Sequence, residues 1–303
     1  MHRGLVRRLL TLGVMALLAG SAQAVPPSQG HSAPVELHIR TTHAVVLRVI
    51  RLGRPSTKPP LVLIPGWTVG LEVWQPVATK LGQDRDVVLL DSRSQGGSTV
   101  TTAANRPEDR ALDLASLLRH LRLRRPILIG WSQGVQDLAA FVSAYGDKNL
   151  AATVLVDAVP SGGASELKRD PVEAGKFFDL LSLYRSSPLE YQRGMMGYII
   201  GDPSRMQFRE RLAKKGLRTP SSIGADMLVA DLYGVDRTRV RFTRPLLVLI
   251  AGRNPNPTPL KTWAETNHAK VVVVADSSHA LFVDRPGEFV TAIKSLEAEI
   301  DDE

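Results

Sequence analysis

Cysteine is absent from the 303-residue chain, and aromatic residues make up only 5% of it. The lack of cysteine excludes a disulfide framework, a thiolate metal site and a cysteine nucleophile. The scarcity of Phe, Trp and Tyr argues against a surface that stacks the bases of single-stranded nucleic acid. With 44% hydrophobic residues, the chain is long and apolar enough to bury a sizeable core. The composition therefore indicates a globular protein rather than a fibrous or disordered one.

The first 24 residues have the pattern of a secretory signal peptide. Three arginines form a basic start, residues 9–18 form an apolar run, and Ala22-Gln23-Ala24 is a small-x-small cleavage site. We expect cleavage after Ala24, a periplasmic or extracellular location, and no stable membrane insertion afterwards, because the run is short for a bilayer. An uncleaved N-terminal anchor helix is the alternative.

The formal net charge of +8 is modest once this segment is set aside. Its three arginines account for three of those charges, which leaves +5 on the rest of the chain. The remaining basic residues are spread along the sequence rather than clustered. They indicate a solvated basic surface, and no nucleic-acid partner is expected.

Strand and helix patterns alternate after a flexible lead-in over residues 25–33. Eight runs are predicted as strands: 35–40, 45–52, 60–65, 87–91, 127–130, 153–157, 246–250 and 271–274. Most are apolar on both faces, as is typical of parallel strands covered by helices on each side. Helical periodicity appears between or after them: 108–121, 136–145 and 289–300. The sequence predicts an α/β fold with a mostly parallel sheet.

One interval, 161–243, contains no strand run. Four segments in it have helical patterns: 171–186, 188–200, 204–215 and 221–233. An interval of this length is too long for a plain loop in a compact domain. We therefore expect a helical cap over 161–243, inserted into a core formed by 34–160 and 244–303.

The strongest chemical signal is Gly130-Trp131-Ser132-Gln133-Gly134, between a predicted strand and a predicted helix. G-x-S-x-G in that setting is a nucleophile elbow, a sharp turn that lifts the serine hydroxyl clear of the sheet. The glycines are needed because side chains there would collide with the neighbouring strand and helix. The motif makes Ser132 the candidate nucleophile.

A serine hydroxyl needs a neighbouring base to act as a nucleophile near neutral pH. Of the seven histidines, His279 alone falls just after the last predicted strand and before the final helix. The carboxyl ends of parallel strands face one crevice, where ligands bind. We therefore expect Ser132 and His279 to converge there, although 147 residues separate them.

These motifs, with three further segments, resemble the α/β-hydrolase family, in its branch of capped esterases and haloperoxidase-like enzymes. Pro65-Gly66-Trp67 is similar to the family's His-Gly-x segment, residues 91–98 to its Asp-x-Arg-Gly-x-Gly-x-Ser loop, and residues 278–286 to its histidine segment. The resemblance covers residues 34–300. It implies the α/β-hydrolase fold, with an eight-stranded sheet, and an oxyanion hole formed by the backbone N–H groups of Trp67 and Gln133.

The third member of a catalytic triad departs from the family pattern. The family places its acid in Gly-x-x-Asp-x-x-x-Pro, and Pro255 stands at that position in the matching stretch 252–259. Proline cannot accept a hydrogen bond from an imidazole N–H. We predict Asp157, at the end of the sixth strand, as the substitute. The alternatives are two amides that flank Pro255 and two acids of the insertion: Asn254, Asn256, Asp231 and Asp236.

Together with the signal pattern, the resemblance implies a secreted serine hydrolase that cleaves a carboxylic ester through an acyl-enzyme. The sequence has no metal-ligand cluster and no Gly-rich phosphate loop, so neither a cofactor nor a metal is expected. The apolar side chains of the insertion favour a small-molecule ester with partly apolar groups. Three other functions are compatible with the same fold. They are a cofactor-free perhydrolase, a peptide hydrolase, and a non-catalytic binding protein that lost its triad acid.

Overall fold

The computed structural model describes residues 32–41, 44–54, 56–165 and 171–301 of the chain. Its eight strands are β1 (Ser32–Arg40), β2 (Val46–Gly53), β3 (Leu61–Ile64), β4 (Asp86–Leu90), β5 (Ile127–Trp131), β6 (Ala152–Val156), β7 (Leu246–Ala251) and β8 (Lys270–Val274). Because β1 begins at Ser32, the last two residues of the expected lead-in belong to a strand. The rest of the lead-in and the predicted signal peptide lie outside the described residues.

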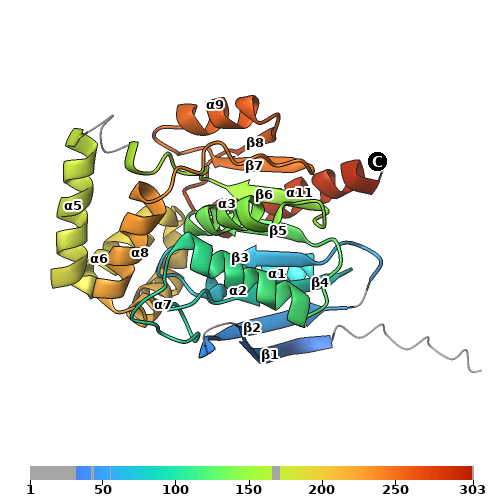
Figure 1. Ribbon diagram of the computed structural model, residues 1–303, viewed down its shortest axis with the longest axis horizontal. Helices are drawn as coiled ribbons and strands as arrows, with labels where there is room; N and C mark the ends of the chain where they lie inside the picture. Colours follow the sequence, from blue (N-terminus) through green and yellow to red (C-terminus); the bar gives the residue numbers. More distant parts are fainter. Residues whose placement is uncertain (1–31, 42–43, 55, 166–170, 302–303) are drawn as a thin grey trace, which may run out of the picture. The chain divides into compact units, whose positions relative to one another are not determined.

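The strands form one sheet in the order β1-β2-β4-β3-β5-β6-β7-β8 (Figure 1). The pairs β1–β2 and β2–β4 are antiparallel, and the other five pairs are parallel. The predicted mostly parallel eight-stranded sheet is thereby confirmed. Since β3 to β8 run in one direction, their carboxyl ends lie along a single edge, where the loops of the candidate site begin.

Helices cover both faces of the sheet. They are α1 (Gln75–Leu81), α2 (Pro107–His120), α3 (Gln133–Tyr145), α9 (Thr258–Thr266), α10 (Leu281–Asp284) and α11 (Pro286–Asp301). Alternate residues of β3 point to opposite faces of the sheet and belong to two apolar cores. Leu61 and Leu63 pack with α1 and α11, whereas Val62 and Ile64 pack with α2 and α3. Figure 1 shows α2 and α3 in front of the sheet and α1 and α11 behind it. Two buried faces explain the doubly apolar strands.

The interval between β6 and β7 is helical. It contains α5 (Pro171–Ser186), α6 (Pro188–Ile199), the short η3 (Pro203–Arg205), α7 (Met206–Gly216) and α8 (Ser221–Tyr233). Tyr184 and Met227 from these helices pack with Trp67, which follows β3, in a third apolar cluster. The helices gather beside one end of the strands (Figure 1). They therefore border the edge on which the candidate site lies.

Three α-helices of the described residues were not expected from the sequence. They are α1, which is preceded by the short η2 (Leu71–Trp74), α9, and the four-residue α10. The seven residues of α1 are too few to show a helical period, and α9 buries only Trp263 and Ala264. Within the described part of the chain, no helix has the length and apolarity needed to cross a membrane.

Candidate active site

Ser132 occupies a strained turn between β5 and α3. Its backbone angles are φ 55° and ψ −114°, a left-handed conformation that costs a non-glycine residue about 1–3 kcal/mol. A Cβ on Gly130 would lie 2.5 Å from the Gly134 carbonyl oxygen, and one on Gly134 would lie 2.7 Å from the Ile64 oxygen. Both glycines are thus required by close backbone approach. The packed strand and helix hold the turn that presents Ser132.

His279 lies in the loop between β8 and α10, and its Nδ1 is 2.8 Å from Oδ2 of Asp157. Asp157 follows β6 directly, has φ 48°, and its side chain is almost fully buried. The other carboxylate oxygen, Oδ1, accepts from the Ala251 N–H and from the Asn254 side-chain amide, each at 2.9 Å. A carboxylate only accepts hydrogen bonds, so Nδ1 carries the proton and Nε2 is left as the basic nitrogen.

The other candidates for the third triad position contact different groups. Asn254 lies behind the Asp157 carboxylate rather than on the imidazole, and its Oδ1 accepts from the Asn256 backbone N–H at 2.9 Å. Asp231 bonds the side chains of Arg110 and Gln133, and Asp236 accepts from its neighbour Thr238. The geometry brings Asp157 to His279, and gives Asn254 a supporting position that the sequence did not reveal.

Two further groups fix the loop that carries His279. Asp284 accepts three backbone N–H bonds, from Ser278 at 2.7 Å and from Gly201 and Asp202 at 3.1 Å each. The indole Nε1 of Trp131 donates to the His279 carbonyl at 2.9 Å. Both residues belong to motifs that are visible in the sequence, but their function there was not predicted. They hold the imidazole relative to the turn at Ser132.

The backbone amides proposed for the oxyanion hole belong to Gln133, which directly follows Ser132, and to Trp67 in the loop after β3. Gln133 is the first residue of α3, so its N–H has no intrahelical acceptor. Trp67 follows Gly66, and a Cβ on Gly66 would come within 3.2 Å of Ser132 Cβ. Glycine at 66 therefore lets the loop after β3 approach the serine closely. Trp67 itself donates from Nε1 to the Gly224 carbonyl at 2.7 Å, which ties this loop to α8.

Ser132 and His279 line the same cavity, of about 610 Å³. Its walls are mostly apolar and come largely from the helices between β6 and β7, with Leu183, Met195 and Leu228 among them. Ser132 and His279, which were expected to converge at one cleft, thus both border this cavity. The cavity offers an uncharged organic group a site directly beside both side chains.

A buried cluster of charges lies next to the turn. Arg110 of α2 bonds Asp137 of α3, with Nε 2.7 Å from Oδ1, and also Asp231 of α8. Gln133 joins the cluster through its side-chain amide, which donates to Asp231. Burial raises the pKa of Asp137 to about 7, against the attraction of Arg110, and burial likewise raises the pKa of Asp231. The cluster links two core helices to α8 beside Ser132.

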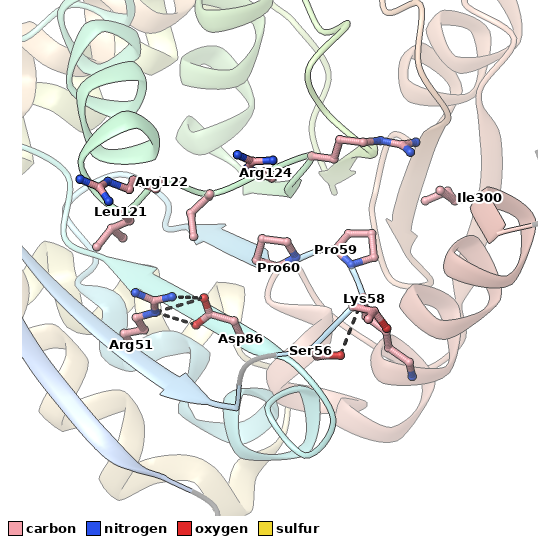
Figure 2. A pocket seen from close by; sticks show the side chains of 13 residues that line it. Arg51, Ser56, Lys58, Pro59, Pro60, Asp86, Leu121, Arg122, Arg124 and Ile300 are labelled. Carbon is pink, nitrogen blue, oxygen red and sulfur yellow. Dashed lines mark hydrogen bonds and ion pairs between the residues drawn. The ribbon is translucent and has the colours of Figure 1, made fainter.

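A second large pocket lies at the opposite end of the strands (Figure 2). It borders Pro60, just before β3, and Asp86, the first residue of β4. Figure 2 shows Arg51 paired with Asp86 and the basic chains of Arg122 and Arg124 around the rim. Its lining residues contain no histidine, so it does not bring a serine and a histidine together as the cavity at Ser132 does. Throughout the described ranges, no three acidic or histidine side chains form a metal site.

Comparisons with known proteins show what this chain is similar to. A pimeloyl-acyl-carrier-protein methyl ester esterase from Vibrio parahaemolyticus is 26% identical over 251 residues, which cover 78% of this chain and 94% of the relative. A thermophilic esterase structure from Thermogutta terrifontis has 21% identity and a TM-score of 0.72, covering 89% of this chain and 99% of that one.

A bromoperoxidase structure from Bacillus anthracis also has 21% identity, with a TM-score of 0.76, and covers 87% of this chain and 99% of its own. At this identity, the two structures show the shared fold alone. The model of the alpha/beta hydrolase family matches residues 61–292, well over half of the sequence. The match spans the turn at Ser132, the carboxylate of Asp157 and the loop of His279, and the chain therefore belongs to the alpha/beta hydrolase family.

Proposed function

We propose that this protein is a serine hydrolase that cleaves carboxylic esters through an acyl-enzyme. The observation that supports the proposal most is the 2.8 Å contact between His279 Nδ1 and Asp157 Oδ2, because His279 also lines the cavity that Ser132 lines. In this contact, Asp157 has the role of the acid that the family usually places where Pro255 stands here. It favours an active enzyme over a binding protein that has lost its triad.

In the proposed mechanism, Ser132 Oγ attacks the ester carbonyl carbon and His279 Nε2 takes the hydroxyl proton. The negative charge on the carbonyl oxygen is stabilised by the Trp67 and Gln133 N–H groups. The carbon–oxygen bond to the alcohol then breaks, and the alcohol leaves with the proton from His279. Water attacks the acyl-enzyme by the same route, releasing the acid and restoring Ser132.

Asp157 stabilises the imidazolium that forms in both halves of the reaction. Its carboxylate keeps Nδ1 protonated and the ring oriented, while the Ala251 N–H and the Asn254 amide hold the carboxylate. The apolar walls of the cavity suit a substrate with uncharged organic groups. The methyl ester esterase relative is consistent with an ester as substrate.

The test is ester hydrolysis by the purified protein, measured with p-nitrophenyl acetate and butyrate. We expect turnover that Ser132→Ala lowers by about 10³-fold or more, to a residual rate from the remaining site. The exposed Ser186→Ala serves as the matched control and should retain full activity. A rate of ester hydrolysis in Ser132→Ala equal to that of the unmodified protein would overturn the proposal. Peroxide-dependent bromination, assayed in parallel, separates a perhydrolase from an esterase.

We also propose that the protein is exported and cleaved after Ala24, on the basis of the signal pattern alone. Expression with cell fractionation, followed by intact mass measurement, tests this. The expected product begins at Val25 and is released with a periplasmic marker, whereas a variant without residues 2–24 stays in the cytosol. A membrane-bound product that retains its first 24 residues would instead identify an anchor helix.

A further inference from the structure

Ser132 lies at the junction of two cavities. The larger, of about 610 Å³, also contacts His279. The smaller, of about 200 Å³, also contacts Gln133 but not His279. Trp67 and Leu228 line both cavities as well. An ester bound at Ser132 therefore has two unequal spaces for its two halves.

The chemistry of the proposed mechanism decides which half enters which space. The oxygen of the departing alcohol must come within hydrogen-bond reach of His279, because that imidazole returns the proton to it. The carbonyl oxygen must at the same time point to the Trp67 and Gln133 amides. The alcohol group is therefore directed into the cavity that His279 borders, and the acid group into the cavity beside Gln133.

The walls of the small cavity are held by their own hydrogen bonds. Gln136 Nε2 donates to the Val159 carbonyl at 3.0 Å, and its Oε1 accepts from the Ser161 N–H at 3.0 Å. Ser161 Oγ in turn donates to the Leu232 carbonyl. Because the polar groups of this wall satisfy one another, enlarging the cavity breaks hydrogen bonds. It suits only a short acid group.

The walls of the large cavity are apolar and open outward. Leu180, Leu183 and Tyr198 line it and are 50%, 42% and 66% exposed, so the cavity continues to the surface between α5 and α6. Its lining contains one carboxylate, Glu190, and neither lysine nor arginine. An anionic alcohol group finds no partner there and meets a like charge. A bulky, uncharged group is favoured.

We infer that the enzyme prefers esters that join a short acid to a bulky, uncharged, apolar alcohol or phenol. This inference rests on the proposed ester hydrolysis and adds which half of the ester, the acid or the alcohol, is the larger one. A methyl ester of a bulky acid has the reverse arrangement and is the disfavoured substrate.

Two isomeric esters, which carry the same aromatic ring on opposite sides of the ester bond, test this preference. Benzyl acetate places the aromatic ring on the alcohol, and methyl phenylacetate places it on the acid. Initial rates of acid release at constant pH give kcat/KM for each, corrected for its rate of hydrolysis by hydroxide. We expect benzyl acetate to be preferred by about tenfold or more, the scale on which a pocket discriminates apolar groups.

A variant that fills the large cavity provides the second arm. Gly194 of α6 lines that cavity, and a Cβ there meets no atom within 4 Å, so Gly194→Leu projects new bulk without a backbone clash. We expect it to lower kcat/KM for benzyl acetate about tenfold and kcat/KM for methyl acetate by a much smaller factor. Gly197→Leu is the matched control, because Gly197 has the same open surroundings on the same helix but does not line the cavity.

Each outcome has a defined meaning. Preference for benzyl acetate, with selective loss in Gly194→Leu, supports the inference. Equal rates, preference for methyl phenylacetate, or equal loss on benzyl and methyl acetate in Gly194→Leu overturns it while leaving ester hydrolysis intact. If neither isomer nor any p-nitrophenyl ester is hydrolysed, the proposed function itself fails, and the inference fails with it.

Discussion

At the scale of single residues, the imidazole of His279 depends on a carboxylate from the end of β6. Asp157 reaches Nδ1 across 122 positions of sequence, and its buried side chain is held by three hydrogen bonds. We expect Asp157→Asn to lower kcat by about 10³- to 10⁴-fold, because an amide favours the wrong tautomer and leaves the imidazolium unstabilised. Steady-state kinetics with p-nitrophenyl acetate measure this, and circular dichroism checks the fold. Full activity in Asp157→Asn would mean that the acid lies elsewhere.

Asn254 contributes through Asp157 rather than by touching substrate. Its amide is one of two donors to Oδ1, and the Ala251 N–H remains when it is removed. We expect Asn254→Ala to lower kcat by about tenfold with little change in KM, as fits the loss of one charge-assisted hydrogen bond. Asn256→Ala, two residues away, is the control. A larger effect for Asn254→Ala than for Asp157→Asn would reverse the two assignments.

At the scale of elements, the β5–turn–α3 unit is built on two glycines. In Gly134→Ala the new methyl group would meet the Ile64 carbonyl oxygen at 2.7 Å, so α3 has to move away from β3. We expect a loss of about 1–3 kcal/mol in the free energy of unfolding and a large loss of activity. Gly197→Ala on α6, where the added methyl group meets open space, should instead stabilise the protein slightly. Urea unfolding of both variants provides the comparison, and a neutral Gly134→Ala would contradict the close packing.

The same elements show what the sequence was able to predict. The strands were predictable because each central one is apolar on both faces, and Ser132 was predictable because its turn has a local glycine signature. The hydrogen bond from Asn254 to Asp157 could not be predicted, because it joins positions that are 97 residues apart. In addition, Pro255 stands where the family pattern has its acid, so the pattern gave no guide to this stretch. The unequal cavities also escaped prediction, since they depend on how α6 and α8 pack over the turn.

At the scale of the whole molecule, the buried Arg110, Asp137 and Asp231 cluster makes stability depend on pH. The pKa of Asp137 rises from 3.8 to about 7 on folding, so the folded protein holds a proton that the unfolded chain releases between these values. This contribution to the free energy of unfolding is greatest below about pH 4 and declines as the pH rises toward 7, by up to about 4 kcal/mol.

Asp137→Asn removes the titrating group and retains an oxygen that accepts from Arg110. We expect the variant to lose less stability than the unmodified protein between pH 5 and pH 8, measured by urea unfolding at both values. Asp179→Asn, at an exposed position, is the control and should not change the difference in the free energy of unfolding between pH 5 and pH 8. An unchanged pH dependence in Asp137→Asn would show that this carboxyl does not take up the proton.

In the proposed mechanism, Ser132 is a nucleophile that His279 and Asp157 activate. Mass spectrometry of peptides after reaction with a fluorophosphonate tests it most directly, because the reagent captures only an activated serine. We expect one adduct, on the peptide that contains Ser132, formed rapidly in the unmodified protein, slowly in Asp157→Asn and not at all in Ser132→Ala. An adduct on another serine, or none in the unmodified protein, would contradict it.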